Sequence, residues 1–230
     1  MTRTAGHDII RAPCCAGYMT TPRYASVNLS ALEHWTDGQK VHGLSPNDGG
    51  LRRCRCGRFF LLKNATVMPR ISVAPPVRRS LFSWRPAQHR SIDFDLPAAE
   101  YVSDHAMLTV IEMADGDEEM LIVARRRHWR HLNNQFREVY REHKRHSPDG
   151  FPHFVVTAEQ RENMQQLVSL LTHSNGPDRL ELAELHRELG DFDACMAIVA
   201  GYSQVQSVMA KVHAGLIDLG YPGPARVRLH

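Results

Sequence analysis

Four of the five cysteines stand in two closely spaced pairs, Cys14-Cys15 and Cys54-x-Cys56. Disulfides are rare inside cells, and the start of the chain lacks an apolar stretch of signal-peptide length. Paired thiols in a reduced chain predict a metal site, because tetrahedral zinc accepts four thiolates from two short loops. Such a site constrains the fold strongly, since it requires two segments about forty residues apart to meet.

The spacing of these cysteines departs from the usual C-x-x-C pattern. Two adjacent cysteines bind one metal only with an unusual backbone, so a histidine is an alternative to one of them: His7, His34 or His42. Gly57 follows the second pair and permits the tight bend that a ligand loop needs. We predict one structural zinc, with buried reduced thiols or redox-active thiols as alternatives, and with these ligands: Cys14, Cys15, Cys54 and Cys56.

The composition is that of a globular protein. Of 230 residues, 43% are hydrophobic and 23% are charged, which excludes a chain that is disordered throughout. No run of eighteen apolar residues occurs, so we expect no membrane span and a cytoplasmic location. The net charge of +3 is too small to indicate a polyanionic partner by itself.

Charge changes sign along the chain, and this suggests its division. The blocks 1–65, 66–97, 98–120, 121–150 and 151–230 carry +5, +3, −7, +5 and −3. We predict a cysteine-bearing, zinc-ribbon-like module over 1–65, a proline/arginine-rich and acidic connecting segment over 66–116, and a helical domain over 117–230. In the module, Tyr24 and Trp35 are the expected core anchors, and residues 58–62 form an expected strand.

The connecting segment is predicted to be irregular, because proline recurs through residues 66–97. Its apolar side chains are costly to leave in water, so we expect them to pack on the protein or on a partner. Arginines interleave with them, a mixture that also suits single-stranded nucleic acid. The apolar residues concerned are Phe82, Trp84, Ile92 and Phe94.

A long helix is predicted over residues 118–146. Ile122, Trp129 and Phe136 recur every seven residues, Asp117 is the expected N-cap, and basic residues gather at the end. The alternative is a β-hairpin in which residues 107–113 pair with 120–124.

The polar faces of this helix are strongly basic, which suits an anionic partner such as nucleic acid. We favour the alternative that the acidic segment 98–120 neutralises them within the molecule. The candidate partner surface comprises Arg125, Arg126, Arg130, Arg137, Arg141, Lys144 and Arg145.

Four further helices are predicted in the last eighty residues. Thr157 with Gln160 is a capping box that opens the first, the second covers about 178–189, the third follows directly on the Gly190 turn, and the fourth covers about 203–219. The stretch Leu189-Gly190-x-Phe192, followed by the small residue Cys195, resembles the inter-helix turn of a tetratricopeptide repeat. The fold class is therefore α+β, mainly α: a small β/loop module followed by an antiparallel helical domain with one such hairpin.

No catalytic motif of the hydrolase, metalloprotease or dinucleotide-binding kind occurs. On the helix over 178–189, Glu181, Glu184 and Glu188 are expected to face solvent, as are His186 and Arg187. We therefore expect a protein that is not an enzyme.

Several stretches resemble a group of uncharacterised bacterial proteins. They include Trp35-Thr36-Asp37-Gly38, Leu51-Arg52-Arg53-Cys54, Cys56-Gly57 and Trp129-Arg130-His131-Leu132-Asn133-Asn134. The resemblance covers about 1–65 and 125–220, and it implies a cytosolic bacterial protein that joins a cysteine-bearing module to a helical half. It implies no activity, since the group has none assigned.

These observations predict a non-enzymatic interaction or adaptor protein with structural zinc and a helical protein-binding domain. One alternative is a nucleic-acid-associated protein that uses the basic helix over 125–146. Another is an enzyme whose site is not visible in the sequence.

Overall fold

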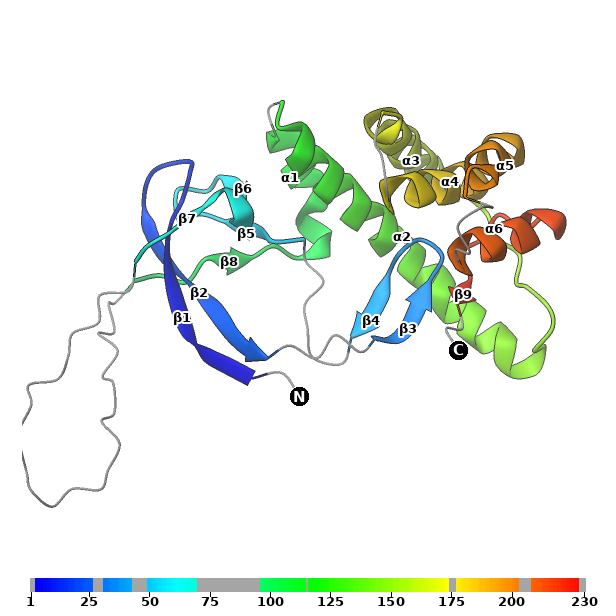
Figure 1. The fold of residues 1–230 in the computed structure, drawn as a ribbon, viewed down its shortest axis with the longest axis horizontal. Helices are drawn as coiled ribbons and strands as arrows, with labels where there is room; N and C mark the ends of the chain where they lie inside the picture. The colour runs from blue at the N-terminus through cyan, green and yellow to red at the C-terminus, as the bar shows by residue number, and fades with distance from the viewer. Residues whose placement is uncertain are drawn as a thin grey trace, which may run out of the picture. The chain divides into compact units, whose positions relative to one another are not determined.

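The computed structural model of the chain divides into two compact units. Unit 1 comprises Met1–Val27 and Arg52–Tyr101, and unit 2 comprises Asn28–Leu51 and Val102–His230. The described residues 31–42 lie between the cysteine pairs in the sequence but belong to unit 2, so the predicted bounds 1–65 include residues of both units. The residues that the structure describes are 3–26, 31–42, 49–69, 96–114, 116–173, 177–202 and 208–227, drawn in colour in Figure 1.

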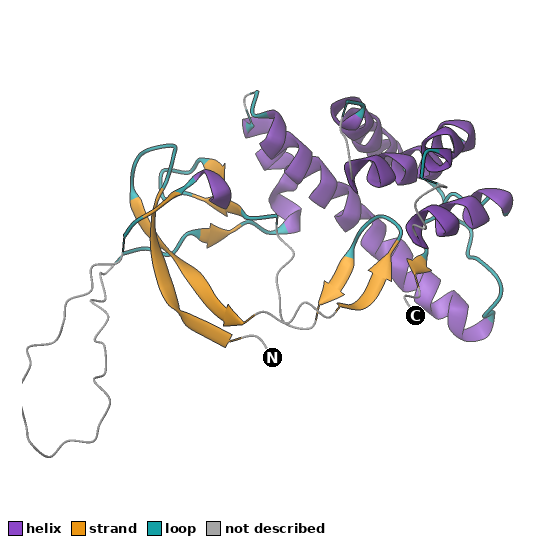
Figure 2. Cartoon of the chain, in the orientation of Figure 1, coloured by secondary structure: helices purple, strands orange, loops and turns teal. Residues whose placement is uncertain are grey.

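Unit 1 consists of two small sheets (Figure 2). The hairpin of β1 (Arg3–Arg11) and β2 (Tyr18–Ser26) is extended by β7 (Thr66–Val67), in the order β2-β1-β7. The second sheet has the order β6-β5-β8, from β5 (Leu51–Arg53), β6 (Phe59–Leu61) and β8 (Glu100–Tyr101). A 3-10 turn, η1 (Leu62–Asn64), follows β6. The strand predicted over 58–62 is thus confirmed as β6.

The hydrophobic core of unit 1 is small. Ile10 lies opposite Met19 in the β1–β2 register, and both side chains are buried with Phe60 and Cys54. Each large apolar side chain that is fully buried contributes about 1.5–3 kcal/mol. With so few of them, a unit of this size gains from an additional cross-link such as a metal ion.

Unit 2 is helical apart from one small sheet (Figures 1 and 2). The sheet has the order β4-β3-β9, from β3 (Ala31–Trp35), β4 (Lys40–His42) and β9 (Arg226–Val227). The helices are η2 (Asp104–Ala106), α1 (Met107–Met113), α2 (Glu118–His146), α3 (Ala158–Leu171), α4 (Pro177–Glu188), α5 (Phe192–Ala200) and α6 (Val208–Asp218). Pairing of β3 with β9 joins the early hairpin to the C-terminal part of the unit.

Trp35 anchors the β3–β4 hairpin to α2. Its side chain is 1% exposed, and its ring meets that of Tyr140 edge to face at a centroid distance of 5.2 Å. Trp35 is therefore a core residue, as predicted, but in unit 2 and not in the cysteine-bearing part. Tyr24, the other predicted anchor, is 38% exposed and is not a core residue.

Helix α2 has the bounds predicted from the sequence. Asp117 caps it by accepting a hydrogen bond from the Met120 backbone N–H at 2.9 Å, and Trp129 in its fourth turn is fully buried. The alternative hairpin is wrong, because residues 107–113 form helix α1. A helix prevails here because the apolar residues follow a seven-residue period and both termini carry charges that suit the helix dipole.

The later helices follow their local signals. Thr157 and Gln160 form the predicted capping box at the start of α3. Gly190 takes a left-handed conformation, with φ of +84°, between α4 and α5, and Cys195 is buried in an apolar cluster. The last predicted helix is present as α6, although residues 203–207 lie outside the described part of the chain.

At this level the prediction of a small β-containing N-terminal part and a helical C-terminal part is confirmed. Most of the predicted connecting segment, including Phe82, Trp84, Ile92 and Phe94, lies outside the described residues. Among the helices that the structure describes, none is long and apolar enough to cross a membrane.

Candidate metal centre

Cys14 and Cys15 lie on the turn that joins β1 to β2. A hydrogen bond of 2.9 Å from the Ala12 N–H to the Gly17 carbonyl closes this turn. Within it, Ala16 has a φ of +53°, a left-handed conformation that few alanines adopt, and its N–H donates to the Ala12 carbonyl at 3.0 Å. An unusual backbone conformation therefore follows directly after the two adjacent cysteines.

Cys54 and Cys56 lie on the turn between β5 and β6. The Cys54 N–H donates to the Arg58 carbonyl at 2.8 Å, and the Gly57 N–H donates to the Cys54 carbonyl at 2.8 Å. Gly57 has a φ of +88°, so the tight bend predicted after the second pair is confirmed. Each cysteine pair therefore occupies one short hairpin turn of unit 1.

The four sulfur atoms form one cluster. All lie within 4.8 Å of one another, with 3.5 Å between the Sγ atoms of Cys14 and Cys56 and 3.4 Å between those of Cys15 and Cys54. Four sulfurs bound to zinc at about 2.3 Å in a tetrahedron are about 3.8 Å apart, so small movements would complete such a site. The structure thus brings together the four cysteines that the sequence proposed as a group.

The structure does not support the alternative histidine ligands whose side chains it describes. Among the described residues, the group of His, Cys, Asp and Glu atoms able to hold a metal consists of the four cysteines alone. His7 and His34 are not members of it, and the side chain of His42 lies outside the described part.

The sulfurs differ in acidity. Burial raises the pKa of Cys14 to about 12 and also raises that of Cys54. The Arg58 backbone N–H donates to the Cys56 sulfur and lowers its pKa to about 7. Metal ions bind thiolates, so Cys56 is the donor closest to the required state at neutral pH, and binding would release protons from the buried thiols.

The arrangement can hold a metal ion with protein ligands only. Four thiolates suit soft or borderline ions, of which zinc is the common tetrahedral example. With all four cysteines bound to one ion, no coordination position would be left for a substrate. Cys15 and Cys56 are exposed whereas Cys54 is buried, so an ion has access from solvent.

Comparisons with known proteins give no match. No family model, no curated protein and no solved structure matches this chain. The similarity to uncharacterised bacterial proteins therefore stays a prediction, and function has to be inferred from the geometry and charge of the chain itself.

Arg137, predicted to lie on a basic partner surface of α2, is buried instead. It is 1% exposed and forms an ion pair with Asp37 in the β3–β4 turn. It also donates to the Arg130 carbonyl at 2.8 Å, and Arg130 Nε donates to the Asp37 carbonyl at 3.0 Å. Contrary to the prediction, Arg137 cannot contact a partner at the surface.

The other basic residues of the predicted surface also have partners inside unit 2. Arg126 pairs with carboxylates of α4, and Arg141 with one of β3. Neutralisation within the molecule is thus supported. The acidic segment 98–120 supplies one of the acids involved, Asp104, which pairs with Arg127, whereas most of the carboxylates that pair with arginines of α2 lie outside this segment. The remaining contacts are Arg125 to Asn163, Lys144 to the Pro148 carbonyl and Arg145 to Glu142.

Two glutamates and an arginine of α4, expected to face solvent, are buried. Glu184 and Arg187 are 0% exposed, and Arg187 donates to Glu184 at 2.9 and 2.6 Å. His213 of α6 lies 3.2 Å from the same carboxylate. The prediction is wrong because α4 packs against α3, α5 and α6 and has little free surface. We refer to the buried charged residues of α4 and the Asp37–Arg137 ion pair together as the buried charge cluster, which comprises Asp37, Arg137, Glu184, Arg187 and Glu188.

Glu188 connects the two ion pairs of this cluster. It accepts hydrogen bonds from Trp129 Nε1 at 2.8 Å and from Asn133 Nδ2 at 3.2 Å, and Asn133 also donates to Asp37 at 3.1 Å. Burial, followed by the charges of Glu184 and Asp37, raises the pKa of Glu188 well above its ordinary value. Because each ion pair is already balanced, a neutral Glu188 leaves the cluster without net charge.

We expect Glu188→Gln to reduce the loss of stability at alkaline pH. A carboxyl whose pKa is raised by folding contributes its full stabilisation below the unfolded-state value of 4.5, and loses it as pH rises toward the folded-state value. Glutamine resembles the neutral carboxyl and does not titrate. Urea unfolding between about pH 5 and pH 9 should show a shallower decline for this variant than for the wild type. Equal slopes would contradict the assignment, and Glu162→Gln on the exposed side of α3 is the matched control.

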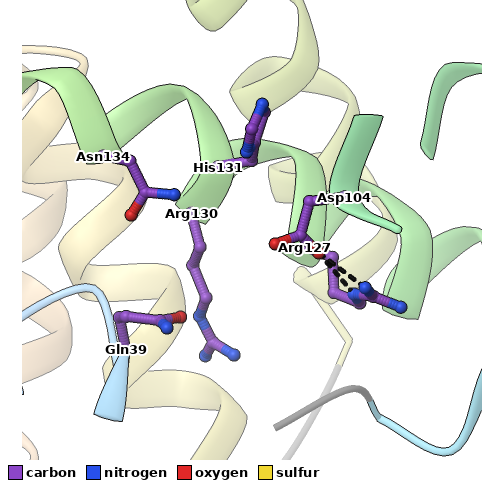
Figure 3. Close-up of a pocket in the computed structure, with 6 residues that line it drawn as sticks. All are labelled: Gln39, Asp104, Arg127, Arg130, His131 and Asn134. Atoms are coloured by element: carbon purple, nitrogen blue, oxygen red, sulfur yellow. Dashed lines mark hydrogen bonds and ion pairs between the residues drawn. The ribbon is translucent and has the colours of Figure 1, made fainter. Parts of the chain in front are cut away.

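A small polar pocket lies beside α2 within unit 2 (Figure 3). Figure 3 shows Arg130 and Gln39 on one side of it and the Arg127–Asp104 ion pair on the other. Its volume of about 40 Å³ holds a few water molecules or one small ion, whereas sites for organic ligands occupy roughly 300–1,000 Å³. The pocket is lined by Gln39, Asp104, Arg127, Arg130, His131 and Asn134.

Proposed function

We propose that this chain is a non-enzymatic interaction protein in which one structural zinc ion holds unit 1 together. The observation that carries the proposal is the meeting of four sulfur atoms, from two hairpin turns, within 4.8 Å. A closed set of four thiolates is typical of structural zinc, whereas catalytic zinc keeps one position open.

A structural role also agrees with the size of unit 1. Cys54 and Cys14 pack against the same few apolar side chains that form its core, so the cluster lies at one end of that core. The two cysteine turns belong to different sheets, and a shared ion would fix one sheet to the other.

Unit 2 is the proposed protein-binding part. Several apolar side chains in its last two helices, and in the turn after α6, are exposed: Met196 by 37%, Val208 by 51% and Leu219 by 66%. The α4–α5 hairpin, with its left-handed Gly190, resembles a tetratricopeptide turn, and such helical pairs present their surfaces to partners. The resemblance to uncharacterised bacterial proteins that the sequence predicts, together with cysteines that suit a reducing compartment, is our reason to propose the bacterial cytosol. Crosslinking in the native host that finds no protein on unit 2 would reject this part of the proposal.

Elemental analysis of the purified full chain tests the metal. We expect about one zinc ion per chain, and about none in a Cys14→Ser, Cys56→Ser double variant, because two of four ligands are lost. Cys195→Ala is the matched control, since it removes a thiol from unit 2 and should leave the zinc content unchanged. Purification without metal would contradict the proposal, and stoichiometric iron would retain the site but reject zinc.

A further inference from the structure

The positive charge of the chain is concentrated in unit 1. Unit 1 contains thirteen Lys/Arg and four Asp/Glu, a net charge of +9, whereas unit 2 contains fifteen and twenty-one, a net charge of −6. The total of +3 conceals this division. A polyanionic partner would therefore be attracted to unit 1 more than to α2, whose arginines are paired within an acidic unit.

Three exposed arginines surround the cysteine turns of unit 1. Arg11 ends β1, Arg55 stands between the two ligands of the second turn, and Arg58 closes that turn. Their guanidinium groups have no carboxylate partner among the residues that the structure describes. They differ in this respect from the arginines of α2, and their charge is available to a ligand.

An exposed aromatic ring lies close to two of these arginines, Arg11 and Arg55. Tyr18 is 44% exposed and stands directly opposite Arg11 in the β1–β2 register, so the two side chains share one face. Arg55 comes close to the residue that precedes Tyr18, because its Nε lies 3.7 Å from the position that a Cβ on Gly17 would occupy. We refer to these four residues as the basic turn surface: Arg11, Tyr18, Arg55 and Arg58.

We propose that the basic turn surface binds single-stranded nucleic acid. Guanidinium groups form paired hydrogen bonds with phosphate oxygens, and an unpaired base stacks on an exposed tyrosine ring. The bases of a duplex are already stacked on one another, and an acidic peptide has no base to stack on Tyr18. The inference rests on the proposed function in one respect, since the metal would hold the two turns that carry these residues in place.

Fluorescence anisotropy of the full chain with labelled oligo(dT) and oligo(U) tests the inference. Binding should weaken as salt is raised, and a triple variant (Arg11→Ala, Arg55→Ala, Arg58→Ala) should lower the slope of log K against log salt by about 2. Tyr18→Ala should weaken binding on the order of tenfold through loss of stacking. The matched control removes three exposed arginines of unit 2 (Arg145→Ala, Arg161→Ala, Arg179→Ala) and should change the affinity by less than about twofold.

Several outcomes would overturn the inference. The first is absence of binding at low salt, and the second is an equal loss of oligonucleotide affinity in the two triple variants. The third is that polyglutamate competes as strongly as oligonucleotide and Tyr18→Ala leaves the affinity unchanged. Zinc is measured in the same samples, so that a variant that fails to fold is recognised by its lost metal. A zinc-bound wild type that binds no oligonucleotide rejects this inference alone, whereas a zinc-free chain that binds rejects only the proposed zinc.

Discussion

Serine in place of Cys54 is expected to remove the metal and unfold unit 1 while unit 2 stays folded. The Cys54 sulfur lies 3.4 Å from that of Cys15, and the side chain is 3% exposed against Ile10 and Phe60. It is therefore both a ligand and a core residue. Structural zinc contributes about 10–16 kcal/mol in small zinc-binding domains, at least as much as the few large apolar side chains buried in unit 1.

Hydrogen exchange on the full chain, read together with zinc content, measures this effect. In Cys54→Ser, amides of β1, β2 and β6 should lose protection, while those of α2 and α3 should keep it. Chelation of the wild type should give the same pattern, and Cys195→Ala should give neither change. Unchanged protection in unit 1 after the metal has been removed would show that the four thiols are packing residues.

Local signals explain what the sequence predicts correctly. The Asp117 cap, the capping box at Thr157 and the turn glycine Gly190 each act on backbone groups within a few residues, so neighbours in the sequence determine them. The two cysteine turns belong to the same class. Each turn is closed by its own hydrogen bonds, and the presence of two cysteine pairs predicts a shared metal ion although their spacing departs from C-x-x-C.

Long-range contacts explain what the sequence does not predict. The partner of Arg137, Asp37, is 100 residues away, and no local feature separates this buried arginine from the exposed Arg145 on the same helix. Glu184 pairs locally with Arg187, but its burial depends on the helices that cover α4. The signal that would have helped is Trp35, because a buried aromatic carries the turn residues that follow it, including Asp37, toward the core.

Removal of the Asp37 carboxylate is expected to be the most destabilising single change in unit 2. Asp37 is 0% exposed and is bonded to Arg137, and it also accepts from Asn133 Nδ2 at 3.1 Å and from the Gln39 backbone N–H at 3.0 Å. Alanine leaves the guanidinium buried without a counter-charge, which costs about 3–5 kcal/mol in comparable cases. Urea unfolding should show a loss of this size for Asp37→Ala.

A double-mutant cycle separates the ion pair from the turn. Arg137→Met fills a similar volume without charge, so we expect Asp37→Ala to be less harmful in that background than in the wild type. Asp37→Asn keeps an acceptor for the Gln39 N–H but loses the charge, and it should resemble alanine if the ion pair dominates. Additive losses in the cycle would mean that Asp37 acts mainly through the turn and that Arg137 is held by its bonds within α2. A favourable coupling would instead show that the β3–β4 hairpin is fixed to α2 by one buried charge pair.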